Sequence, residues 1–487
     1  MIQGYNPRTG EPAGEPVAET AGTAVDAIVA EAVAAFPAWA ASSGRAEALE
    51  AVADALDANA AELAALADTE TALGSERLTG EVGRTTGQLR MFAAEIRTAG
   101  DGAAGDGGYL DPVISPAAGA APDLRRVNRP VGPVAVFAAS NFPFAFSVAG
   151  GDTASALAAG CTVVVKAHEA HPRTSAATAR IVSEALTSAG APAGTFALVH
   201  GVQAGLRLLR HPSITAAGFT GSTAGGLALA RICADRSVPI PFFGELGSVN
   251  PVVILPAAAQ ARAEQIASGY ATSLTLGTGQ FCTNPGLLFV PEDSALLTAV
   301  ADAVAASSGG PMLSARIFAA YQDAVAATAD QPGVTVLATG KPGEGPWAAT
   351  PRMFAATLKE FTAALAHEQF GPAGIVITYP SLDDLLPVLS ALPGNLTATV
   401  HLDAPDEPMA RQLLPVLERI AGRIICNGWP TGVAVVAAQQ HGGPYPATTA
   451  AAFTSVGTAA IRRWLVPVAY QNFAPELLPA ALRSDVR

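Results

Sequence analysis

Residues 161–200 have the sequence CTVVVKAHEAHPRTSAATARIVSEALTSAGAPAGTFALVH, in which two short apolar runs enclose a longer segment with helical spacing. The apolar runs at 161–166 and 196–200 predict buried strands, and residues 173–188 predict the helix between them. A strand, a helix and a strand at this spacing indicate a mostly parallel sheet with helices on its faces. The sequence therefore predicts an α/β fold in which ligands bind beyond the carboxyl ends of the strands.

The same alternation continues on both sides of this stretch. Residues 133–138 (PVAVFA) predict another strand, and residues 23–40 and 45–67 predict amphipathic helices. A segment rich in Gly, Pro and Ala at 100–122 separates these helices from the strands.

After residue 240 a second strand and helix series begins. A helix is expected over about 257–274, and strands are expected in NPVVIL, AGIVITY and RIICNGW. The chain of 487 residues is too long for one small core, so two unequal α/β domains are expected.

Composition excludes several classes of function. Half of the residues are hydrophobic and 14% are charged, as in a large globular protein, and the formal net charge of −13 argues against nucleic acid and anionic membrane as partners. The N-terminus lacks the pattern of a secretory signal. The uncharged stretch between Arg129 and Asp152 is broken by prolines and glycines, so it does not predict a membrane-spanning helix.

The cysteines indicate neither a zinc site nor a disulfide framework. Cys161, Cys233, Cys282 and Cys426 are far apart and form no CxxC pair. His168 and His171 have no third ligand nearby, and a solvated loop explains them better than a metal site. We therefore expect no metal and a reducing, cytoplasmic location.

Four short motifs have both a structural and a chemical interpretation. GFTGSTAGG (218–226) is either a turn that shapes a helix entry or a loop that binds a pyrophosphate. Lys166 ends an apolar strand, where a solvated lysine is common and a hydroxyl or phosphate contact is the alternative. Asn141 in SNFPF is either a turn residue or an amide donor for an oxyanion. Cys282, in the glycine-rich LGTGQFCTNPG, is either a structural cysteine or a nucleophile.

Glu245 is the fifth candidate. It lies in IPFFGELGS, an apolar segment with no basic neighbour to pair its charge. It is either an ordinary loop residue or a carboxylate held there for chemistry.

Taken together, SNFPF, VVVK, GFTGSTAGG, FFGELGS, GQFC and EQFGP resemble, in order, the motifs of the aldehyde dehydrogenase superfamily. The resemblance extends over essentially the whole chain. The strings FSVAGGDTASALAAGC and HGGPYPATT are most similar to the branch of α-ketoglutaric semialdehyde (2,5-dioxovalerate) dehydrogenases. The long-chain fatty aldehyde dehydrogenase of luminous bacteria is similar too.

The resemblance implies roles for individual residues. Cys282 would be the nucleophile, Glu245 the general base and Asn141 the side-chain half of the oxyanion hole. NAD or NADP would be the cofactor, and the implied cofactor-binding residues are Lys166, Glu169, Gly221, Ser222, Glu368 and Phe370. The implied substrate-binding residues are Phe142, Phe281 and Phe453.

The implied activity is oxidation of an aldehyde to a carboxylic acid through a cysteine thiohemiacetal and a thioester. The expected substrate is α-ketoglutaric semialdehyde (2,5-dioxopentanoate) or a related semialdehyde. A medium- or long-chain fatty aldehyde is the alternative, because NFPFAFS supplies aromatic residues and no arginine for a substrate carboxylate. Further alternatives are a CoA-acylating dehydrogenase, which generally lacks the glutamate base, and a non-catalytic binding protein with this fold.

Two departures from the usual family pattern bear on the site. Ser248 in ELGS replaces the last glycine of the usual motif, as in the branch named above. Glu169 follows Lys166 at a position where NAD-preferring relatives place a ribose-binding carboxylate, although the branch tends towards NADP. A glutamate there would repel a 2′-phosphate unless a cation such as Arg173 offset it.

The resemblance also implies the domain organisation. A Rossmann-type NAD(P)-binding domain would comprise residues 1–114 and 133–240, and an α/β catalytic domain residues 241–440. Residues 115–132 and 441–487 would form a small β oligomerisation element. A homodimer or a homotetramer is expected.

Overall fold

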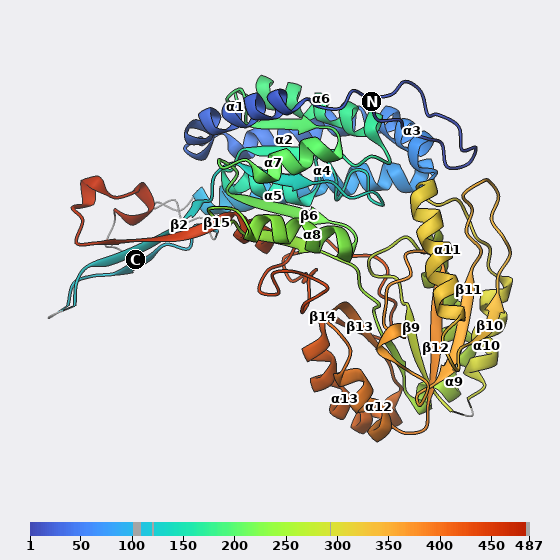
Figure 1. Ribbon diagram of the computed structural model, residues 1–487. Helices are drawn as coiled ribbons and strands as arrows, with labels where there is room; N and C mark the ends of the chain where they lie inside the picture. Colours follow the sequence, from blue (N-terminus) through green and yellow to red (C-terminus); the bar gives the residue numbers. More distant parts are fainter. Residues whose placement is uncertain (101–108, 119–120, 293, 484–487) are drawn as a thin grey trace.

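The computed structural model describes residues 1–100, 109–118, 121–292 and 294–483. Figure 1 shows two lobes joined side by side and an arm that projects away from both. Each of these three parts is built on a sheet of its own.

The first lobe contains a five-stranded parallel sheet with the strand order β5-β4-β3-β6-β7. Its strands are β3 (Val134–Phe137), β4 (Val163–Lys166), β5 (Phe196–Val199), β6 (Ala216–Thr220) and β7 (Phe242–Glu245). Because the strand order reverses between β3 and β6, the chain leaves these two strands in opposite directions and a crevice opens beyond their carboxyl ends.

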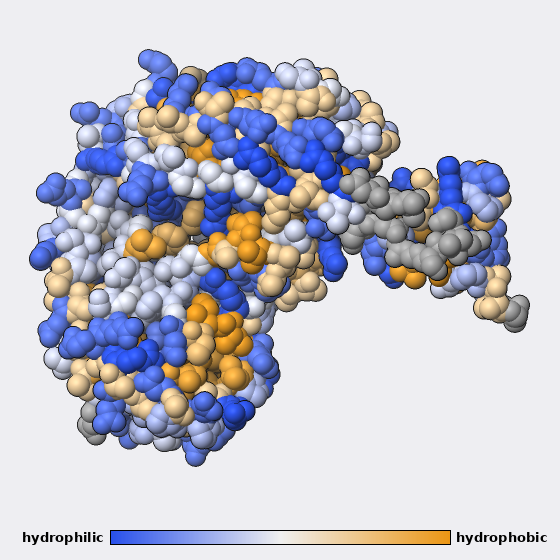
Figure 2. Space-filling model, turned by 180° about the vertical axis from the view of Figure 1, so that it is seen from behind, coloured by the Kyte–Doolittle hydropathy of each residue, from blue (hydrophilic) through white to orange (hydrophobic). Residues whose placement is uncertain are grey.

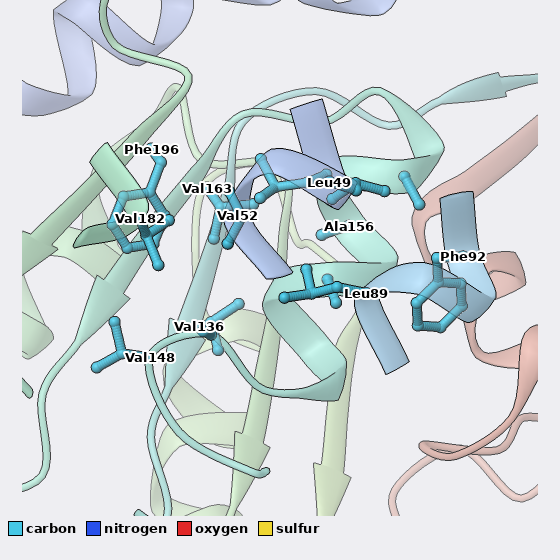
Figure 3. Packing of buried hydrophobic residues seen from close by; sticks show 14 of the residues in the cluster. Leu49, Val52, Leu89, Phe92, Val136, Val148, Ala156, Val163, Val182 and Phe196 are labelled. Atoms are coloured by element: carbon cyan, nitrogen blue, oxygen red, sulfur yellow. The ribbon is translucent and has the colours of Figure 1, made fainter. Parts of the chain in front are cut away.

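Helices cover both faces of this sheet because successive strand residues point to opposite sides and are apolar on each. Val134 and Val136 pack with α2 (Arg45–Ala58), α4 (Ser75–Gly100), α5 (Gly151–Ala159) and α6 (Pro172–Ser188), and α3 (Ala60–Thr71) joins the same cluster. Figure 3 shows Leu49 and Val52 of α2 and Leu89 of α4 in this core. The alternate residues, such as Ala135, pack with α1 (Gly22–Ala40), α7 (Val202–Arg210) and α8 (Thr223–Ala234).

The second lobe contains a seven-stranded sheet with the order β10-β11-β12-β9-β8-β13-β14, parallel except for β10. Its strands are β8 (Val252–Ile254), β9 (Leu287–Pro291), β10 (Thr335–Thr339), β11 (Arg352–Thr357), β12 (Ala373–Tyr379), β13 (Asn395–His401) and β14 (Ala421–Cys426). Helices α9 (Pro256–Thr275) and α10 (Leu296–Ala306) cover one face, and α12 (Leu382–Ser390) and α13 (Glu407–Ile420) the other. Helix α11 (Ala315–Ala329) lies on the side of this lobe that meets the first.

The arm is an antiparallel sheet with the order β1-β2-β15, formed by β1 (Val113–Ser115), β2 (Leu124–Pro130) and β15 (Leu465–Gln471). The short 3₁₀ helices are η1 (Leu276–Gly279), η2 (Ala363–Leu365), η3 (Ala404–Asp406), η4 (Thr458–Trp464), η5 (Pro475–Leu477) and η6 (Ala480–Leu482). In Figure 2, which views the molecule from behind, apolar surface gathers where the lobes meet and on the side of the second lobe that faces the arm.

The predicted α/β fold is confirmed, and so are the strands at 133–138, 161–166 and 196–200. The predicted helix over 45–67 is in fact two helices that meet at Asn59, where the backbone leaves the helical conformation. Helix α4 was not predicted at all, because Gly80, Gly83 and Gly87 interrupt its pattern with residues of low helix propensity.

Two features bear on the expected domain limits and on membranes. Strand β7 pairs with β6, so the first sheet continues past residue 240, and part of the predicted loop at 100–122 lies outside the described residues. One helix among the described residues, α1, is long and apolar enough to cross a membrane by length and composition alone. In this fold Val25, Val29 and Trp39 of α1 are buried against the first lobe.

Candidate active site

A cavity of about 600 Å³ lies between the two lobes, beyond the carboxyl ends of the first sheet. Ten of the residues singled out from the sequence line it together, although they are spread over more than two hundred positions of the chain: Asn141, Phe142, Lys166, Glu169, Gly221, Ser222, Glu245, Cys282, Glu368 and Phe370. The cavity is therefore the candidate active site, and its position is the one that the strand order favours.

Cys282 lies on the loop between η1 and β9, and that loop is held from both sides. Gly279 has a φ of +67°, and a Cβ there would be 2.2 Å from the backbone of Gly371. On the other side Asn250 donates hydrogen bonds from Nδ2 to the carbonyl oxygens of Cys282 (2.8 Å) and Asn284 (2.9 Å). The sulfur is thus placed by backbone contacts that leave little freedom to the loop.

Ser248, the departure from the usual ELGG pattern, belongs to the same support. Its hydroxyl donates to Oδ1 of Asn250 at 2.8 Å and accepts from the backbone N–H of Leu396 at 2.9 Å. Asn395 accepts from the backbone N–H of Val249 and Asn250. The serine therefore ties the ELGS loop to strand β13 and to the asparagine that holds the Cys282 loop.

Cys282 is half-buried, and the desolvation of its thiol raises the pKa to about 12, with a smaller contribution from the nearby Glu368 and Glu245 carboxylates. His441 places Nε2 at 3.7 Å from Sγ. Burial and the charges of Arg423 and Arg84 lower the pKa of His441 to about 3, so its imidazole is neutral at pH 7. At pH 7 Cys282 is thus a neutral thiol next to a neutral imidazole.

Glu245 ends strand β7 and has an exposed fraction of 8%. Its Oε2 atom is buried and has no hydrogen-bond partner. Burial raises the pKa of Glu245 well above its usual value, and the guanidinium of Arg463 opposes this shift while the Asp152 carboxylate adds to it. An unpaired carboxylate with a raised pKa is the kind of group that can take a proton from water near neutral pH.

Asn141 lies on the loop after β3 and reaches across to the second lobe. Its Nδ2 donates to the carbonyl oxygen of Gln280 at 2.9 Å, so one amide N–H is used and the second is left for a ligand. Helix α4 supports the loop from behind. Arg77 donates to the carbonyl oxygen of Asn141 at 2.8 Å, and Oε1 of Glu81 accepts from the backbone N–H of Phe144 and Ala145.

The far end of the cavity contains Lys166 at the end of β4, and its Nζ pairs with Oε1 of Glu169. Burial lowers the pKa of Lys166, and the Glu169 charge opposes the shift. Arg173, expected as a possible counter-charge, points away, because its Nη1 donates to the carbonyl oxygen of Ala13 at 2.6 Å. Arg316 of α11 lines the cavity instead.

The residues between these ends fit a dinucleotide. Ser222 is the N-cap of α8, so the first backbone N–H groups of that helix face the cavity as they would face a pyrophosphate. Burial raises the pKa of Glu368 to about 7. A Cβ on Gly247 would be 2.4 Å from Oε2 of Glu368, so the glycine of ELGS leaves room for this carboxylate. Lys166 and Glu169 would meet one ribose and Glu368 the other.

The three aromatic residues expected at the substrate do not lie together. Phe142 lines the cavity, and Phe281 packs edge-on against it with ring centroids 5.4 Å apart. Phe453 packs against Phe243 in the core of the first lobe and does not line the cavity. The described residues contain no group of side chains suited to a metal ion.

Several residues at the site were missed from the sequence. His441 follows two glutamines in a loop segment, and Asn250 looks like an ordinary turn residue, so neither has a local signal. Arg77 and Arg84 belong to the unpredicted helix α4 and not to NFPFAFS, the segment whose lack of arginine favoured a neutral substrate. Regular spacing of Arg77, Glu81 and Arg84 on one helical face was the available signal.

Comparisons with known proteins agree with the geometry. The model of the aldehyde dehydrogenase family matches residues 1–444. The chain is 46% identical to alpha-ketoglutaric semialdehyde dehydrogenase 2 of Azospirillum brasilense, over 99% of this chain and 94% of the relative. It is 44% identical to the alpha-ketoglutaric semialdehyde dehydrogenase of Acinetobacter baylyi, over 90% and 84%. The crystal structure of aldehyde dehydrogenase C from Pseudomonas syringae with NAD⁺ and octanal superposes with a TM-score of 0.80, 23% identity, and coverage of 97% and 94%.

Proposed function

The chain belongs to the aldehyde dehydrogenase family, and from this premise we propose that it oxidises α-ketoglutaric semialdehyde to the dicarboxylic acid. As a member of the family it is an oxidoreductase that acts on aldehydes with NAD or NADP. The observation that supports the substrate is the 46% identity to an enzyme of that name across nearly the whole of both chains.

We assign the chemistry to three side chains of the cavity. The thiolate of Cys282 adds to the aldehyde carbon, and the free N–H of the Asn141 amide stabilises the oxyanion that forms. A nicotinamide cofactor held by Lys166, Ser222 and Glu368 would supply the acceptor for the hydride that leaves the aldehyde carbon. His441, at 3.7 Å from the sulfur, is placed to orient the thiol, whereas the raised pKa of Glu245 makes that carboxylate the better acceptor for the thiol proton.

The second half of the reaction is assigned to Glu245. A thioester on Cys282 must be attacked by water, and a buried carboxylate with a raised pKa is suited to remove the proton of that water. Because Glu245 supplies a base, the proposal is hydrolysis to an acid, whereas acyl transfer to CoA would need no such group.

An aldehyde panel run with both cofactors tests the proposal. It should contain α-ketoglutaric semialdehyde, succinic semialdehyde and unbranched neutral aldehydes from propanal to decanal, with and without CoA. We expect the highest kcat/KM for α-ketoglutaric semialdehyde, a free acid as product and no effect of CoA. Higher kcat/KM for decanal would support the fatty aldehyde alternative, and no reduced cofactor with any aldehyde would refute the enzymatic function.

We further infer a homodimer or homotetramer in the cytoplasm. The arm formed by β1, β2 and β15 extends away from both lobes in Figure 1, so its strands expose apolar side chains such as Val466 and Val468. The four cysteines are free, which suits a reducing compartment. Light scattering on the purified protein measures the mass, and a monomer at micromolar concentration would contradict the inference.

A further inference from the structure

We propose that Arg84, together with Arg77, forms the binding site for the carboxylate at the far end of the substrate. This inference rests on the proposed function, because it assigns the group that recognises a semialdehyde acid rather than a neutral aldehyde. It corrects the expectation that the aromatic segment NFPFAFS leaves the substrate without a cationic partner.

The two arginines lie on one face of α4, seven positions and two helical turns apart. That face packs against the loop that carries Asn141 and the phenylalanines. The guanidinium carbon of Arg77 is 5.2 Å from the ring centroid of Phe142, and that of Arg84 is 5.4 Å from the ring centroid of Phe146. Both phenylalanines line the cavity, so the arginines form the layer directly behind them.

Each of the two guanidinium groups has buried N–H donors without a partner in the described residues, although Nη2 of Arg77 donates to Asn141. Nε and Nη2 of Arg84 and Nη1 of Arg77 are buried and have no hydrogen-bond partner in the described part of the chain. On the same helix, Arg90 pairs with Asp54 at 2.6 Å and with Asp57 at 2.7 Å. A buried guanidinium donor without an acceptor is costly, and these donors therefore suit an anionic group that enters the neighbouring cavity.

A short chain of contacts leads from Arg84 to Cys282. The ring of Phe146, on which Arg84 stacks, is 6.0 Å from the ring of His441, and His441 is 3.7 Å from the sulfur. The charge of Arg84 acts on both Cys282 and His441. An aldehyde held at the sulfur, with a carboxylate a few carbon atoms away, would place that carboxylate beside Arg84.

Glu81 is not the acceptor for the open donors of Arg77 and Arg84. Its carboxylate lies between the two arginines on α4, yet no ion pair joins it to either of them within the described residues, and its Oε1 accepts from two backbone N–H groups of the 141–146 loop. Two guanidinium groups and one carboxylate leave the cluster with a positive balance. Arg423, the third arginine near Cys282, is held by hydrogen bonds from Nη1 and Nη2 to the carbonyl oxygens of Gly432 and Pro430, so its Nε alone is buried without a partner in the described residues.

A planar guanidinium binds a carboxylate through two parallel hydrogen bonds, which gives both affinity and orientation. The ligand class is therefore a short aldehyde with a terminal carboxylate. The aromatic rings would contact its methylene carbons, and the arginines would fix its length by binding the charged end.

Arg84→Gln tests the site through a ratio of two substrates. In the wild-type enzyme kcat/KM should be higher for α-ketoglutaric semialdehyde than for pentanal, which has the same number of carbon atoms and no carboxylate. We expect Arg84→Gln to lower this ratio about 10- to 100-fold, mostly through KM for the charged substrate. Arg84→Lys, which keeps the charge without the fork, should restore part of it. The matched control is Arg90→Gln on the same helix, and this variant should keep the wild-type ratio.

A second measurement does not depend on turnover. Glutarate has a carboxylate but no aldehyde, and it should inhibit the wild-type holoenzyme competitively and raise its Tm, and both effects should be lost in Arg84→Gln and weakened in Arg77→Gln. An unchanged ratio in Arg84→Gln, or an equal loss for both substrates with glutarate binding retained, would overturn the proposal. If the wild type oxidises aldehydes but prefers pentanal, the arginine site fails while the aldehyde dehydrogenase activity stands. If no aldehyde is oxidised, the proposed function fails and glutarate binding still decides the site.

Discussion

Replacement of Glu245 by Gln separates the two halves of the proposed reaction. The amide keeps the size of the side chain at the end of β7 but cannot take a proton from water. Hydride transfer requires Cys282 and Asn141 and should survive, whereas hydrolysis of the thioester should stall. The expected result is one rapid turnover followed by a slow steady rate.

The size of the burst follows from the cysteines of the chain. Cys282 lines the cavity, whereas Cys161 and Cys233 are buried in the first lobe and Cys426 is exposed at the end of β14. One equivalent of reduced cofactor per chain is therefore expected. The steady rate should fall about 10²- to 10⁴-fold, the usual contribution of a general base, which corresponds to about 3 to 5 kcal/mol of activation free energy.

Stopped-flow absorbance of the reduced cofactor, followed by detection of acyl-enzyme by mass spectrometry, measures both quantities. Stability provides the control for folding. The pKa of Glu245 is higher in the folded chain than in the unfolded chain, so its contribution to stability is complete below the unfolded pKa and is lost as the pH rises towards the folded pKa. At pH 8 the Gln variant should thus be at least as stable as the wild type. A folded variant with an unchanged steady rate, or without a burst, would refute the assignment.

Three further predictions concern neighbouring residues. Cys282→Ala should abolish aldehyde oxidation while cofactor binding, measured by fluorescence titration, persists; retained activity would contradict the role of the thiol. Asp152→Asn breaks the buried pair with Arg463 (2.6 Å) and should cost about 3 to 5 kcal/mol in urea unfolding. The same change removes a charge that raises the pKa of Glu245, so the acidic limb of the kcat profile should move to lower pH, and a shift to higher pH would oppose this account. Glu169→Gln removes the carboxylate beside Lys166 and should raise the ratio of kcat/KM for NADP to that for NAD; an unchanged ratio would place the 2′-phosphate elsewhere.

The sequence was most informative where periodicity is simple. The strand at 161–166 and the helix at 173–188 have uninterrupted patterns, so their type and position were predictable. Helix α4 was not predictable in this way, because its three glycines weaken the helical signal and its stability comes from packing Leu78, Leu89 and Phe92 into the first lobe. Tertiary contacts decide such an element, and a local pattern does not contain them.

The residues of the candidate site also fall into two groups, those that a sequence motif predicts and those that only the fold identifies. Cys282, Glu245 and Asn141 stand in recognisable motifs, and the structure brings all three to one cavity, although their roles remain predictions. His441, which lines the cavity, and Arg84, which stacks on Phe146 of the cavity wall, are about 160 positions after and about 200 positions before Cys282 in the sequence. Only the folded chain brings His441 to the sulfur and Arg84 to the wall of the cavity.

The hydrogen bond from Asn141 to Gln280 joins the two lobes, so it bears on how they are aligned. The carboxylate of Glu245 and the amide of Asn141 belong to the first lobe, whereas the sulfur belongs to the second, so the reacting groups meet only when the lobes are in register. The 2.9 Å hydrogen bond from Asn141 to Gln280 links the two lobes at the reacting centre. A substitution that shifts the lobes relative to each other would therefore lower activity even if it left Cys282, Asn141 and Glu245 unchanged, because it would move the sulfur away from the other two side chains.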